Sequence, residues 1–119
     1  MVDFSGSPGN PSSEYPEKRE VPRFSLIATA EIVEPASGVH ISGRISEISR
    51  KGCYLDVLNT LPEGTRLRIT ISRDQGVFAS QARIIYVQQG MGMGIAFVEV
   101  PPDQLTILDA WLAEFRRPI

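Results

Sequence analysis

From Phe24 onward, apolar residues recur in short runs rich in Ile, Val, Thr and Tyr, with turns between them about every ten residues. β-branched and aromatic side chains favour strands, and runs of this length and spacing are typical of an all-β domain. The alternation is strictest over residues 66–73, where Leu67, Ile69 and Ile71 alternate with polar residues. Successive side chains of a strand point to opposite faces, so this segment predicts one buried and one solvated face. In all, the pattern predicts six strands, near residues 24–34, 39–48, 53–58, 65–73, 77–88 and 92–100.

The connections between these runs are short and rich in Gly, Pro, Ser and Asp. They fall at residues 35–38, 49–52, 62–64, 74–76 and 89–90. Turns this short join antiparallel neighbours. Six antiparallel strands tend to close on themselves, because closure removes exposed strand edges. The predicted fold is therefore all-β, a six-stranded antiparallel β-barrel.

Both ends of the chain depart from the strand pattern. Pro101 and Pro102 end β pairing. Apolar residues then recur at helical spacing, at Leu105, Leu108, Leu112 and Phe115, with Trp111 beside them. This predicts a C-terminal α-helix that packs on the sheet or on a partner. Residues 5–13 have no apolar side chain to offset the entropy of ordering. We therefore expect a disordered tail over residues 1–16 and one domain over residues 17–119.

Composition and charge narrow the function classes. A net charge of −2 gives no basic surplus for sequence-independent binding to nucleic acid polymers, so any anion site must be local. The single cysteine, Cys53, excludes an internal disulfide and agrees with a reducing compartment. No apolar run approaches the length needed to span a bilayer. We expect no membrane insertion and a cytoplasmic location.

Features that suggest catalysis are weak. His40 is the only histidine, and a lone His in a strand is far more often a polar surface residue than a base or a metal ligand. The glycines of residues 90–94 lack the spacing of a phosphate loop, and an apolar strand follows them instead of a helix. No nucleophile, base and carboxylate set or metal cluster is apparent. The sequence predicts a protein that is not an enzyme, with no catalytic residues, no metal and no cofactor.

Arg19 and Arg23 stand four residues apart just before the first predicted strand, with Pro22 between them. The proline biases the residue before it away from the helical region, so we expect an extended or turned arm. Two guanidinium groups on one short arm suit an anionic, planar ligand. They grip phosphate oxygens bidentately, reach the O6/N7 edge of guanine and stack on a base. An ordinary solvated surface pair is the alternative.

The turn after the second predicted strand carries a complementary set. Glu47 and Ser49 stand two apart at a strand end, on one face, and Gly52 permits positive φ and close approach of the backbone. A carboxylate accepts from the N1–H and N2–H donors of guanine, and a hydroxyl donates or accepts. Arg50 and Lys51 offer phosphate contacts. A polar hairpin turn whose glycine serves geometry alone is the alternative.

Each half of this constellation, Arg-x-x-x-Arg or Ser-x-x-Gly, is expected by chance about once in a chain of this composition. Their order and placement carry the information. Together they indicate a guanine-nucleotide sensor.

With the arm, the Ser49-x-x-Gly52 turn, residues 82–87 and residues 92–97, the chain resembles the PilZ domain family over about residues 17–116. That family's signature is Arg-x-x-x-Arg followed by Asp/Asn-x-Ser-x-x-Gly. The resemblance implies a six-stranded barrel with a C-terminal helix that binds the bacterial second messenger cyclic di-GMP, usually in the cytoplasm.

Position by position, the resemblance implies that Arg19 and Arg23 hold guanine and phosphates, that Ser49 bonds a guanine edge, and that Gly52 lets the ligand approach. Lys18 stands where the family helps to decide whether one nucleotide or an intercalated pair is bound. Glu47 departs from the Asp/Asn of the signature. Its extra methylene and rotatable bond weaken preorganisation.

Three functions remain open from the sequence. The first is a cyclic di-GMP sensor whose ligand orders the arginine arm against the barrel and so regulates a downstream protein partner. The second is a PilZ-like interaction module that has lost or weakened nucleotide binding and uses the helix around Trp111 to hold a partner. The third, an oligonucleotide-binding barrel, requires exposed aromatics on basic strands, which the composition disfavours.

Overall fold

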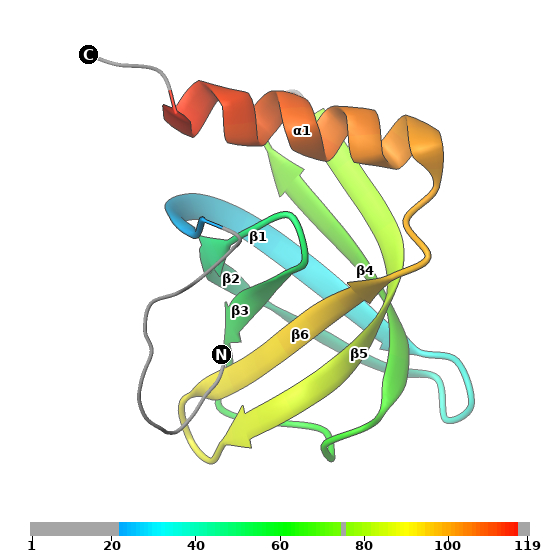
Figure 1. The fold of residues 1–119 in the computed structure, drawn as a ribbon. Coiled ribbons are helices and arrows are strands. Elements are labelled where there is room, and N and C mark those ends of the chain that lie inside the picture. Colours follow the sequence, from blue (N-terminus) through cyan, green and yellow to red (C-terminus); the bar gives the residue numbers. More distant parts are fainter. Residues whose placement is uncertain (1–21, 75, 117–119) are drawn as a thin grey trace.

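The computed structural model describes residues 22–74 and 76–116 and contains six strands followed by one helix (Figure 1). The strands are β1 (Phe24–Glu34), β2 (Val39–Ile48), β3 (Gly52–Asp56), β4 (Arg66–Arg73), β5 (Gly76–Gln88) and β6 (Gly92–Val98), and the helix is α1 (Pro102–Arg116). All the strand pairs are antiparallel, and the order β1-β2-β3-β6-β5-β4 closes into a barrel because β1 also pairs with β4. The predicted barrel and C-terminal helix are confirmed. The expected disordered tail, residues 1–16, lies outside the described residues.

The barrel interior is built by strand alternation. On β4, Leu67, Ile69 and Ile71 are buried while Arg66 and Arg68 between and beside them are exposed, as the sequence pattern predicts. The other strands add apolar side chains to the same core, among them Ile32, Ile45, Leu55, Phe78, Ile84 and Ile95. Burial of about eighteen apolar residues in one cluster is the main source of stability.

Helix α1 lies across one end of the barrel (Figure 1). Its buried face consists of Leu108, Trp111 and Leu112, and the Trp111 ring lies 6.4 Å from that of Phe78, centroid to centroid. The predicted amphipathic helix therefore packs on the barrel. No helix in the part of the chain that the structure describes is long and apolar enough to cross a membrane.

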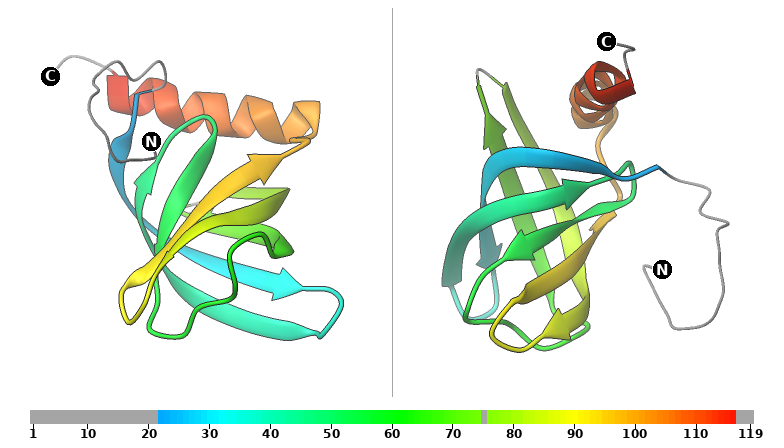
Figure 2. Two further views of the ribbon diagram at one scale, coloured as in Figure 1. Left: turned by 60° about the horizontal axis from the view of Figure 1, so that its bottom comes forward. Right: turned by 90° about the vertical axis from the view of Figure 1, so that its left-hand side faces the viewer.

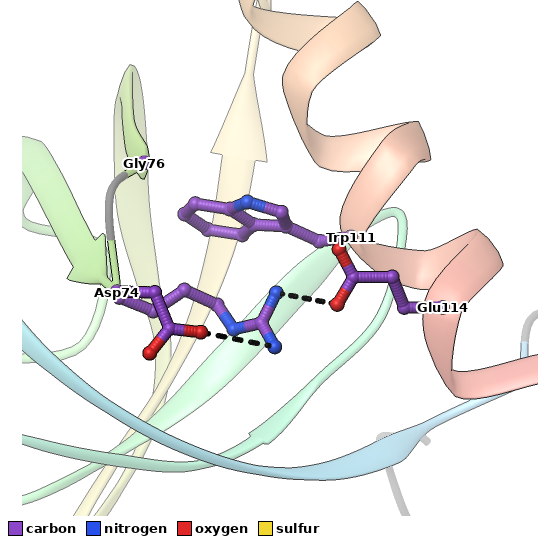
Figure 3. A pocket seen from close by; sticks show the side chains of 5 residues that line it. Asp74, Gly76, Trp111 and Glu114 are labelled. Carbon is purple, nitrogen blue, oxygen red and sulfur yellow. Dashed lines mark hydrogen bonds and ion pairs between the residues drawn. The ribbon is translucent and has the colours of Figure 1, made fainter.

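Arg73, the last residue of β4, contacts helix α1 at Trp111 and Glu114, which are labelled in Figure 3. Its guanidinium carbon lies 5.6 Å from the ring centroid of Trp111 and 5.2 Å from that of Phe115. Its Nη1 donates to Glu114 at 3.1 Å, and Nη2 lies 3.9 Å from Asp74. Charge pairing and cation–π contact together hold α1 against the β4–β5 hairpin.

Candidate functional site

A β-bulge determines the direction of the Glu47 side chain. Ile45 pairs with Leu55 and Glu47 pairs with Tyr54, so Ser46 is an extra residue in β2. Without it, Glu47 would share the inward face of Ile45. The bulge shifts the alternation by one residue, so that Ile48 is buried and Glu47 lies on the outer face.

Arg23 meets Glu47 on this outer face. Arg23 Nη1 donates to Glu47 Oε1 at 3.1 Å, and the two side chains are 19% and 40% exposed. The pair joins the residue just before β1 to the end of β2, where Ser25 and Glu47 are register partners. Two of the residues predicted from the sequence, 24 positions apart, are thus in direct contact.

Ser49 lies inside the turn that connects β2 to β3. It is 7% exposed, and its backbone N–H donates to the Gly52 carbonyl at 2.8 Å. The Ser49 hydroxyl donates to the same carbonyl at 3.4 Å and accepts from the Lys51 N–H at 3.2 Å. The start of β1 and this turn both lie at the end of the barrel that α1 covers (Figure 2).

Gly52 is required by packing against β6. A Cβ at this position would lie 2.1 Å from the Ile95 carbonyl oxygen, which is backbone and has little room to move. The positive φ that the sequence analysis allowed at Gly52 is not used: among the described glycines it occurs at Gly38, Gly64 and Gly90. Gly52 is therefore needed for close backbone approach and not for a positive φ. The group that approaches it is the backbone of β6.

The remaining predicted residues lie apart from this contact. Arg50 Nε donates to Asp109 of α1 at 3.0 Å, so its guanidinium reaches the helix. Lys18 and Arg19 lie outside the described residues. The structure therefore brings Arg23 into contact with Glu47 and Ser49 into contact with Gly52, and it connects the turn to α1 through Arg50.

Two tyrosines on the same outer face were not singled out from the sequence. Tyr54 pairs with Glu47 on one side and with Gly94 on the other, and Gly94 pairs with Tyr86. A second bulge, between Ile84 and Tyr86, turns Tyr86 outward as the first turns Glu47. The two rings lie 6.1 Å apart at their centroids, with an angle of 36° between their planes.

Glycines make room for these rings. A Cβ on Gly94 would lie 2.3 Å from the Tyr86 ring, and one on Gly92 would lie 2.4 Å from the Leu55 carbonyl oxygen and 2.7 Å from the Tyr54 ring. Both glycines alternate with the buried Met93 and Ile95. That alternation was the available signal, because glycine on the outer positions of a strand suggests that something bulky covers them.

The electrostatics of Tyr86 confirm that these groups share one environment. Burial is the largest cause that raises the pKa of Tyr86 to about 12; Tyr54 and Glu47 act in the same direction, and Arg23 opposes them. Burial, with a smaller contribution from Asp56, also raises the pKa of Tyr54, whose hydroxyl donates to Gln88. Both phenols are therefore neutral hydrogen-bonding groups at physiological pH.

The outer face offers a cation, a carboxylate and two aromatic rings, and a buried hydroxyl lies in the adjoining turn. Burial strongly raises the pKa of the Cys53 thiol, which keeps it protonated and unreactive. Across residues 22–74 and 76–116, no three His, Cys, Asp or Glu side chains gather in a way that would hold a metal ion. These groups suit recognition of a planar, anionic ligand.

Comparison with known proteins agrees with this reading. The family model of the PilZ domain matches residues 17–114. No curated protein sequence matches the chain.

Several solved structures share the fold. The cyclic di-GMP-bound PilZ domain of YcgR from Escherichia coli is 20% identical with a TM-score of 0.71, and the match covers 85% of this chain and 93% of that one. The PilZ domain of CeSA from a cellulose-synthesizing bacterium is 18% identical with a TM-score of 0.62, over 80% and 98% of the two chains. The Bacillus subtilis inhibitor of motility MotI/DgrA is 16% identical with a TM-score of 0.69, over 82% of this chain but only 50% of that one.

Proposed function

Since the chain belongs to the PilZ domain family, whose members are typically non-catalytic adaptors for cyclic di-GMP, we propose that it binds cyclic di-GMP on the outer face around Arg23 and Glu47. The observation that supports the proposal is the 3.1 Å contact between these two residues, because it sets Arg23 against Glu47, two positions before Ser49 of the signature turn. A cytoplasmic location is part of the same proposal.

Each group has a role that follows from its chemistry. Arg23, with Arg19 from the arm, binds phosphate oxygens or the O6/N7 edge of guanine. Glu47 accepts from the guanine N1–H and N2–H donors, and the Ser49 hydroxyl bonds the base edge. Lys18 governs whether one or two nucleotides bind. Gly52 keeps the turn close to β6, and Arg50 steadies it through Asp109.

Ligand binding replaces the internal ion pair. Arg23 and Glu47 satisfy each other, so a ligand must supply an anion for the guanidinium and donors for the carboxylate at once. Cyclic di-GMP carries both, in its phosphates and its guanine edges. This requirement favours guanine over bases that offer no pair of N–H donors on that edge.

Ordering of the arm provides a route to the helix. Phe24 directly follows Arg23 and stacks on Phe115 of α1, with centroids 5.5 Å apart. Arg50 reaches Asp109 on the same helix. Ligand at the arm thus biases the position of α1, and α1 presents the changed surface to a downstream protein partner.

Titration calorimetry with cyclic di-GMP tests the proposal. Wild type is expected to bind, and Arg23→Ala and Arg19→Ala each to weaken binding about ten- to a hundredfold, as for loss of a charged hydrogen bond. Arg68→Ala, which removes an exposed arginine from β4, is the matched control and should bind as wild type does. Absence of heat with wild type at high ligand concentration would refute the function.

The second candidate is a PilZ domain that holds a partner without nucleotide. The observation in its favour is that Glu47, longer than the Asp or Asn of the signature, already occupies Arg23. Glu47→Asp discriminates between the two. If the ion pair blocks the ligand, Asp withdraws the carboxylate and binding appears only in the variant.

A further inference from the structure

A groove adjoins the outer face beyond Tyr86. It has a volume of about 450 Å³ and runs between β5 and the connection from β3 to β4, with a lining that includes Thr60, Leu61, Pro62, Glu63, Tyr86 and Val87. Tyr86 is therefore shared: its ring forms one wall of the groove and also meets Gly94 and Tyr54 on the outer face.

Backbone hydrogen bonds hold the groove open. The Gly64 N–H donates to the Ile84 carbonyl at 2.7 Å, and the Ile84 N–H donates to the Thr65 carbonyl at 3.0 Å. The Leu61 N–H contacts Met93 Sδ at 3.3 Å. The wall formed by the connection from β3 to β4 is thus tied to β5 and β6, so little ordering of this wall is needed when a ligand binds.

The lining suits a flat molecule with a polar edge. Tyr86 supplies an aromatic face, and Leu61 and Val87 pack against the hydrophobic core. Glu63 and Thr60 add a carboxylate residue and a hydroxyl residue to the lining. A purine base stacks on an aromatic face and offers N–H donors along its edge, which a carboxylate accepts.

The groove is separated from the Arg23–Glu47 pair by a continuous row of register partners. Glu47 of β2, Tyr54 of β3, Gly94 of β6 and Tyr86 of β5 follow one another across the barrel. Three strand spacings amount to about 14 Å. This is the scale of a molecule with two bases, and the Tyr86 ring lies over Gly94, so an aromatic surface continues along the row.

We propose that this groove takes one purine base of the ligand, stacked on Tyr86, while Arg23 and the turn at Ser49 hold the phosphates and the other base. The inference rests on the proposed function for the identity of the ligand. It adds a second base subsite that the Arg-x-x-x-Arg and Ser-x-x-Gly motifs do not include. It also assigns a use to both bulges, since each directs one end of the row outward.

Calorimetry with cyclic di-GMP on Tyr86→Leu and Tyr86→Phe tests this subsite. Loss of one stacked base predicts binding weakened about five- to 150-fold in Tyr86→Leu. Tyr86→Phe keeps the ring and should stay within about threefold of wild type on the same stacking argument. Thermal unfolding of each variant checks that the barrel is intact.

A second measurement uses the wild-type protein and so does not depend on whether the Tyr86→Leu variant folds. In wild type with labelled tyrosine rings, cyclic di-GMP should shift the Tyr86 ring resonances upfield, with Tyr86→Phe providing the assignment. Wild-type binding with unchanged affinity in Tyr86→Leu, or with unshifted Tyr86 resonances, overturns the subsite and leaves the proposed function standing. If Tyr86→Phe and Tyr86→Leu lose affinity for cyclic di-GMP equally, stacking on the ring is not the basis of the subsite. Absence of wild-type binding overturns both proposals.

Discussion

The ring of Phe24 stacks on the ring of Phe115, with centroids 5.5 Å apart and an angle of 29° between the planes, so the first strand touches the last turns of the only helix in the described residues. The contact joins Phe24, the residue next to Arg23, to Phe115, which lies 91 positions later in the chain (115 − 24). It places the residue next to Arg23 directly against α1.

Phe24→Leu should weaken the coupling between ligand binding at Arg23 and the position of α1. Leucine keeps an apolar contact but loses the ring pair, which contributes about 1 kcal/mol. Trp111 on α1 is the chain's only tryptophan and reports the helix by its fluorescence. We expect cyclic di-GMP to change Trp111 emission in wild type and to change it less in Phe24→Leu at saturating ligand. An undiminished response would show that the signal takes another route.

The Arg23–Glu47 pair should contribute modestly to stability. Because its side chains are 19% and 40% exposed, water screens their attraction, and pairs of this kind are worth about 0.2–1 kcal/mol. A double-mutant cycle of Arg23→Gln and Glu47→Gln, followed by urea unfolding, measures the coupling. It should shrink as salt rises. A coupling of several kcal/mol would mean that the pair is structural and hard for a ligand to open.

Gly52→Ala should destabilise the barrel by about 3 kcal/mol, since the added Cβ meets the Ile95 carbonyl oxygen and must push β3 from β6. Gly64→Ala is the comparison, because nothing lies within 4 Å of its Cβ position and only its φ of 90° is strained. We expect about 1 kcal/mol there. Equal losses in thermal unfolding would contradict the steric explanation.

Arg73→Gln should loosen the helix and lower the free energy of unfolding by about 1–2 kcal/mol. The change removes the cation from between Trp111 and Phe115 and from its 3.1 Å bond to Glu114. Emission of Trp111 should shift to the red as water reaches the ring. Arg68→Gln, an exposed arginine on the same strand, should leave both quantities unchanged.

Stability should fall as pH rises from about 10 to about 12. The pKa of Tyr86 is raised to about 12 by burial, so the folded state holds its proton more tightly than the unfolded chain, whose tyrosine titrates near 10. The stabilisation is complete below pH 10 and is lost through pH 12. Because the side chain is partly exposed, we expect about 1 kcal/mol from it.

Tyr86→Phe isolates this contribution. Burial also raises the pKa of Cys53, so ionisation of this thiol at high pH destabilises the protein in the same direction. Because Cys53 is present in both proteins, its contribution cancels in the comparison. The difference between wild type and Tyr86→Phe across pH 10–12 therefore belongs to the phenol. A difference independent of pH would contradict the assignment.

Much of the barrel was predictable because strand alternation is a local property. The strands predicted at residues 24–34 and 39–48 match β1 and β2, and the other strand ends differ by no more than two residues. The turn prediction placed Gly52 in a loop, whereas it begins β3, since its close approach to Ile95 lets pairing start there.

The site was predictable in part. The signature identified Arg23 and Glu47, which are in contact. Nothing in the sequence marks the bulges at Ser46 and before Tyr86, because an extra residue shows only against a partner strand. The partner of Arg50, Asp109, is 59 positions away, and no local pattern connects them. The roles of Lys18 and Arg19 stay predictions.

Gly92 and Gly94 have a consequence for how this surface can change over time. The surface between the two tyrosines depends on the absence of a side chain at these glycines. Adding one methyl group is therefore enough to change its shape. A single methyl at Gly94 would displace the Tyr86 ring from its place, whereas one at Gly92 would lie 2.4 Å from the Leu55 carbonyl oxygen and would also push β6 from β3. Replacing Gly94 with alanine is thus a one-step route to a chain in which the Tyr86 ring takes another position on this face while the strand pairing is unchanged.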